Sequence, residues 1–117
     1  MKITLWEEVR IDSEITPEML EELSVSSIQN RLDKLSEKLP KFAKLEPNAT
    51  DVINKIKEVD LQQAFDTQIQ NLYRIHSILI NFDVYLDLIL HKSLTDGWQK
   101  NYENDVEKLK ALLARIM

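Results

Sequence analysis

Apolar positions are densest between Asp60 and Lys92, where their spacing predicts one α-helix of about 33 residues. At about 100° per residue, most of these side chains share one broad face, and a narrower apolar strip lies away from it. Such a helix is surrounded, so we expect that it is the central helix of a bundle or that it also contacts another chain; a break at Phe82-Asp83 stays open. The broad face holds Leu72, Ile75, Ile78, Leu79, Phe82, Leu86, Ile89 and Leu90, and the strip holds Tyr73, Ile80 and Val84.

Two other stretches repeat apolar residues at spacings of three or four, which predicts one buried stripe on each helix. Pro40 disfavours helical geometry at Leu39, so the first helix should end near Lys38, with one short turn after it. The stripes are Val25, Ile28, Leu32, Leu35, Leu39 and Phe42 in the first, and Trp98, Tyr102, Val106, Leu109, Leu113 and Ile116 in the second.

Helix starts are indicated by residues that can cap free backbone amides. Thr16 before Pro17 predicts a short helix to about Leu23, and the serines after it suggest a fresh cap. A helix should begin at Thr50 or Asp51, and a capping box at Asp60 predicts a corner before the long helix. We expect a core drawn from Ile28, Leu32, Leu35, Phe65, Leu72, Leu79, Phe82, Leu86, Val106, Leu109 and Leu113.

The fold class predicted is therefore all-α, a four- to five-helix bundle over residues 16–117 that forms a single domain with a short extended arm, residues 1–15. Alternating apolar residues predict the extended arm, and Trp6 is its anchor, against this chain's own core or in a partner's groove. One glycine and 44% hydrophobic residues disfavour β-rich and disordered chains.

Composition and charge exclude several classes of function. The chain has no cysteine, so disulfides, thiol catalysis and Cys-ligated metals are excluded. The net charge of the chain is −5. Even the most basic segment, residues 24–57, has four acidic residues beside its seven basic ones, so we expect no nucleic-acid binding. No apolar run approaches a membrane span or a signal peptide's core, so we expect a cytosolic protein without a membrane partner.

One stripe of the long helix could carry chemistry, since it combines two imidazoles with two carboxylates at His76, Asp83, Asp87 and His91. Such ligands can hold a divalent metal, but the two histidines are about 22 Å apart along the axis, too far to share one ion. A partly solvated stripe, with Asp87 and His91 as an ordinary pair, is the better interpretation. We expect neither metal, cofactor nor small-molecule substrate, and no enzyme activity, because phosphate loops and nucleophile motifs are also missing.

The function that these patterns favour is a protein-protein interaction module, a structural or adaptor subunit of a larger assembly or a homo-oligomer. The narrow apolar strip must be covered by the chain's own arm, another copy or a foreign subunit. The alternative is a small acidic inhibitor, of the immunity-protein or antitoxin type, that neutralises a basic partner. The residues predicted to bind the partner are Trp6, Tyr73, Ile80 and Val84.

Overall fold

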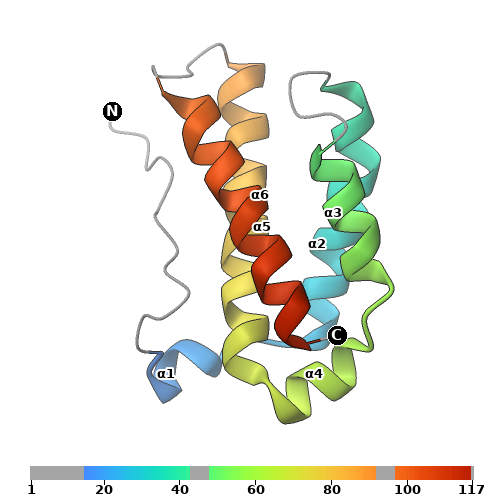
Figure 1. Ribbon diagram of the computed structural model, residues 1–117, viewed down its shortest axis with the longest axis vertical. Helices are drawn as coiled ribbons and strands as arrows, with labels where there is room; N and C mark the ends of the chain where they lie inside the picture. The colour runs from blue at the N-terminus through green and yellow to red at the C-terminus, as the bar shows by residue number, and fades with distance from the viewer. Residues whose placement is uncertain (1–14, 43–47, 92–96, 117) are drawn as a thin grey trace.

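The computed structural model describes residues 15–42, 48–91 and 97–116, and within these ranges every regular element is a helix (Figure 1). The predicted all-α class is thus confirmed. The predicted arm, Trp6 included, lies outside the described residues except for Ile15. The helices are α1 (Pro17–Leu20), α2 (Val25–Lys38), the 3₁₀ turn η1 (Leu39–Lys41), α3 (Asn48–Lys57), α4 (Leu61–Thr67), α5 (Ile69–Leu90) and α6 (Trp98–Ile116).

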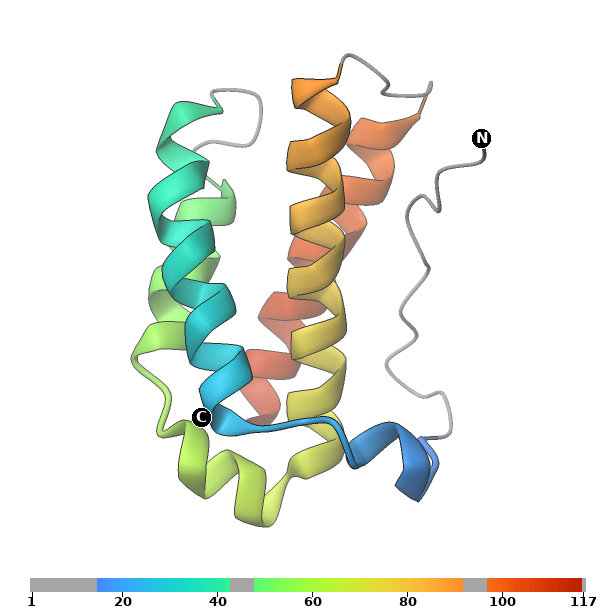
Figure 2. The ribbon, with the colours of Figure 1, turned by 180° about the vertical axis from the view of Figure 1, so that it is seen from behind.

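Four long helices form the bundle, running alternately up and down in the order α2, α3, α5, α6 (Figure 1). Each packs against two of the others, in the pairs α2–α3, α3–α6, α6–α5 and α5–α2. The short helix α4 lies across the base of the bundle against α5, and α1 stands beside the first half of α5, as Figure 2 shows from behind. No helix in the described ranges combines the length and the apolar character that crossing a membrane requires.

Local capping explains most helix boundaries. Thr16 caps α1, where its Oγ1 accepts a hydrogen bond from the Met19 amide at 3.4 Å, and Ser24 caps α2 by accepting from the Ser27 amide at 3.1 Å. The helix α1 is shorter than predicted, because the chain turns after Leu20 to bury Leu23. As predicted, α2 ends at Lys38 and one short turn follows. The helix α3 begins at Asn48, two residues earlier than expected.

The prediction of one continuous helix from Asp60 to Lys92 is wrong, because the chain breaks at Gln68 into α4 and α5. Asp60 does cap α4, accepting from the Gln63 amide at 3.1 Å. Gln68 has the non-helical angles φ −140° and ψ 47°, and the hydroxyl of Thr67 donates to the Gln63 carbonyl at 2.8 Å. Such a side-chain bond competes with the helical ladder in the last turn. The helix α5 is unbroken at Phe82-Asp83.

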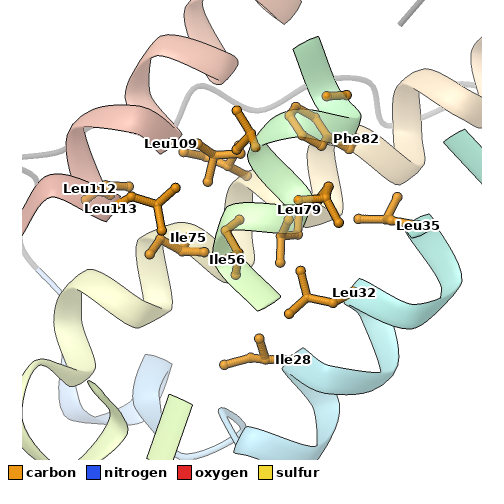
Figure 3. Packing of buried hydrophobic residues seen from close by; sticks show 14 of the residues in the cluster. Ile28, Leu32, Leu35, Ile56, Ile75, Leu79, Phe82, Leu109, Leu112 and Leu113 are labelled. Carbon is orange, nitrogen blue, oxygen red and sulfur yellow. The ribbon is translucent and has the colours of Figure 1, made fainter. Parts of the chain in front are cut away.

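The core lies between the four long helices and contains the predicted stripes (Figure 3). Every predicted core residue is buried except Phe65, which is partly buried and packs against the others. The prediction that Leu90 belongs to the buried face is wrong: Leu90 lies in the last turn of α5 and is 66% exposed. Conversely, α5 buries Tyr85 and Leu88, which were not predicted to lie on the broad face. This helix therefore buries more than half of its circumference.

Candidate functional site

A recess of about 240 Å³ lies where α1, α2 and α5 meet, and we call it the α1–α5 recess. It is smaller than the usual small-molecule pocket and suits a protein side chain better than a metabolite. Met19 reaches it from α1, Leu23 from the turn that follows, and Tyr73 and Ile80 from α5. Its polar lining consists of Glu22, Ser27, Arg31, His76 and Ser77.

The apolar side chains of the recess are unevenly covered. Leu23 is only 6% exposed and belongs to the core, and Tyr73 is partly buried against that core. Met19 and Ile80, in contrast, are 39% and 40% exposed. Within the described residues the third large hydrophobic side chain with such exposure is Leu90, which does not line the recess. Apolar surface is thus concentrated at one place on the α1 side of α5.

The predicted strip is only partly accessible. Ile80 is exposed as expected for a residue away from the broad face, and Tyr73 and Ile80 line the same recess. Val84, one turn further along α5, is half-buried and does not line the recess. Trp6, the fourth predicted partner-binding residue, lies outside the described residues. Sequence reasoning missed Met19 and Leu23, because their contribution depends on where α1 docks.

Arg31 and Asp83 form an ion pair that links α2 to α5 beside the recess. Both side chains are partly exposed, so the pair contributes little stability, about 0–1 kcal/mol, but it holds the guanidinium in place. Asp83 therefore contacts a neighbouring helix. In the described parts of the chain, no group of three or more His, Asp and Glu side chains could hold a metal ion.

His76 lies at the polar edge of the recess, on α5. Burial lowers the pKa of His76, and the neighbouring positive charge of Arg31 lowers the pKa further. The imidazole is therefore neutral at pH 7. Its buried Nε2 atom has no hydrogen-bond partner within the described residues.

The serine hydroxyls of the recess are engaged by their own helices. Ser27 donates to the Ser24 carbonyl at 2.9 Å, and Ser77 donates to the Tyr73 carbonyl at 3.1 Å. No hydrogen bond joins His76 to either serine in the described ranges, so the histidine and the hydroxyls do not form a nucleophile and base. The chemistry available here is burial of an apolar group, with a few polar atoms to orient it.

A larger hollow of about 420 Å³ lies at the base of the bundle, between the turn before α4 and the end of α6. Val59, Ala64 and Ile116 are its apolar residues, and Glu58, Asp60 and Gln63 are among its polar ones. Of the predicted binding residues that the structure describes, none lines it. The exposed apolar side chains Met19 and Ile80 make the α1–α5 recess the better candidate for binding.

Comparisons with known proteins identified no relative of this chain. No protein-family model matches the chain. Searches of curated proteins and of solved structures likewise found no match.

Proposed function

We propose that this protein is a non-enzymatic, cytosolic interaction module, a structural or adaptor subunit, that binds a protein partner through the α1–α5 recess. One observation carries the proposal: two of the three large hydrophobic side chains exposed in the described residues, Met19 and Ile80, border the same recess. Burying an Ile side chain contributes about 1.5–3 kcal/mol, so a partner that covers both residues gains useful affinity. Aromatic or aliphatic side chains of the partner fit the recess best.

The test compares two neighbouring residues of α5 that differ in burial. Leu79 is fully buried and Ile80 is exposed, although both are apolar. We expect Ile80→Asp to keep the helical circular-dichroism signal while it abolishes partner capture from extracts of the source cells. Leu79→Asp should unfold the protein, because it buries an unpaired charge in the core. Leu90→Asp, at an exposed residue outside the recess, is the matched control and should capture the partner as the parent does.

Two outcomes would contradict this proposal. If Ile80→Asp unfolds the protein as completely as Leu79→Asp does, Ile80 is part of the core in solution. If all the folded variants capture the same proteins in the same amounts, the recess is not the binding surface. Sedimentation of the purified parent and of Ile80→Asp tests whether the partner is a second copy of the chain. If the parent self-associates through the recess, Ile80→Asp should be monomeric.

A small acidic inhibitor is the second candidate, and the charge around the recess favours it. Glu18, Glu21 and Glu22 are exposed on and just after α1, and Glu22 lines the recess. A basic partner would gain from these carboxylates, and its binding would weaken steeply with added salt. An adaptor that binds through apolar contacts would lose little affinity under the same salt titration.

A further inference from the structure

The segment before α1 is tethered next to the α1–α5 recess, because α1 itself borders the recess. The described residues begin at Ile15, directly before the Thr16 cap, and Met19 in the recess is four residues further on. Fourteen residues precede Ile15. From Trp6 to Ile15 an extended chain spans up to about 30 Å, which is enough to return to a recess that borders α1 itself.

The composition of residues 1–14 matches the apolar part of the recess. Trp6 is the largest side chain of the segment and the best anchor, since aromatic side chains combine large apolar area with a polar atom. Its indole N–H is a donor only, and the recess offers acceptors in the Glu22 carboxylate and the Ser27 and Ser77 hydroxyls. The other apolar residues of the segment are Met1, Ile3, Leu5, Val9 and Ile11.

We propose that residues 1–14 dock into the α1–α5 recess of their own chain, with Trp6 inserted between Met19 and Ile80. A short tether holds its end at an effective concentration in the millimolar range, above the concentration of most cellular partners. The segment therefore occupies the recess in the free protein, and a partner binds by displacing it. The proposal shares its recess with the proposed function, but its test needs no partner, so either can fail alone.

The test uses tryptophan fluorescence of the full chain. Trp6 and Trp98 are the two tryptophans, so Trp98→Phe leaves Trp6 as the only reporter. We expect its emission to be blue-shifted and its quenching by acrylamide to be several-fold weaker than for a synthetic peptide of residues 1–14. Adding Ile80→Asp or Met19→Asp should restore peptide-like emission and quenching, because each substitution puts a charge in the recess where Trp6 would bind. The two residues belong to different helices, so the same result from both would identify the recess itself. Leu90→Asp is the control and should leave Trp6 protected.

Each alternative occupant gives a distinct result that overturns the proposal. Peptide-like emission from Trp6 in the parent background would show that the segment does not dock. Protection that survives both Ile80→Asp and Met19→Asp, with circular dichroism unchanged, would place Trp6 elsewhere. Protection that disappears on about hundredfold dilution would show that the segment occupies a second copy, because an intramolecular contact is independent of concentration.

Discussion

The hydroxyl of Tyr85 offers a test of how much a buried hydrogen bond stabilises the core. Asp105 of α6 is fully buried, and its Oδ2 atom accepts a hydrogen bond from the Tyr85 hydroxyl at 2.9 Å. Asn81 donates to the same oxygen at 3.4 Å. Tyr85→Phe removes this donor and keeps the ring, which packs edge-on against Tyr102 at 5.9 Å.

We expect Tyr85→Phe to lower the free energy of unfolding by about 1.5–3 kcal/mol, because the substitution removes a hydrogen-bond donor from a fully buried acceptor oxygen. The loss is large against a total of about 5–15 kcal/mol for a domain. For a chain of this size each kcal/mol corresponds to roughly 4 °C, so the melting temperature should fall by roughly 6–12 °C.

The assay is urea unfolding followed by circular dichroism for Tyr85→Phe, Asp105→Leu, which removes the acceptor, and the double variant. The cycle isolates the coupling between the two side chains, which should be at least about 1 kcal/mol. Tyr73→Phe is the matched control, because the Tyr73 hydroxyl has no hydrogen bond within the described residues. A Tyr85→Phe variant within about 0.5 kcal/mol of the parent, with no coupling to Asp105→Leu, would show that this hydrogen bond does not stabilise the core.

Two further predictions follow from the site and from the base of the bundle. Because burial and Arg31 lower the pKa of His76 below 6.5, the unfolded state binds more protons, so the free energy of unfolding should fall as pH drops below 6.5 and stay flat above it. Urea unfolding between about pH 7.5 and 5.5 should show this slope in the parent and in His91→Gln but not in His76→Gln, and an equal slope in all three would contradict it. Asp60→Ala should lower the free energy of unfolding by about 0.5–2 kcal/mol through loss of the α4 cap, whereas Asp60→Asn should lose much less; equal losses in urea unfolding would show that the cap is unimportant.

The sequence alone determined the helices and most of their ends, because these depend on residues within one turn of each other. Thr16 and Ser24 each cap the helix that the pattern predicted after them, and Asp60 caps α4, the first part of the predicted long helix. Pro40 ends α2 where its missing amide predicts. The buried stripes follow in the same way, since a spacing of three and four puts side chains on one face wherever that helix packs.

Only the tertiary structure decided the features that join separate helices. The break at Gln68 is hidden in the sequence, because apolar spacing runs through it from Ala64 to Leu72, and it appears only when α4 has to cross the base of the bundle. Asp105 lies three residues after Tyr102 and four before Leu109, on the buried stripe, but local spacing does not predict that a carboxyl group is buried there. Its burial depends on the donor that Tyr85 of α5 supplies.

The candidate site shows the same division. Periodicity placed the apolar residue Ile80 away from the broad buried face, because the position of a residue around a helix depends on α5 alone. It could not pair Ile80 with Met19, nor Arg31 with Asp83, which lie 52 residues apart. Such contacts depend on which helices pack together, and that choice is set by the burial of the whole core rather than by local spacing.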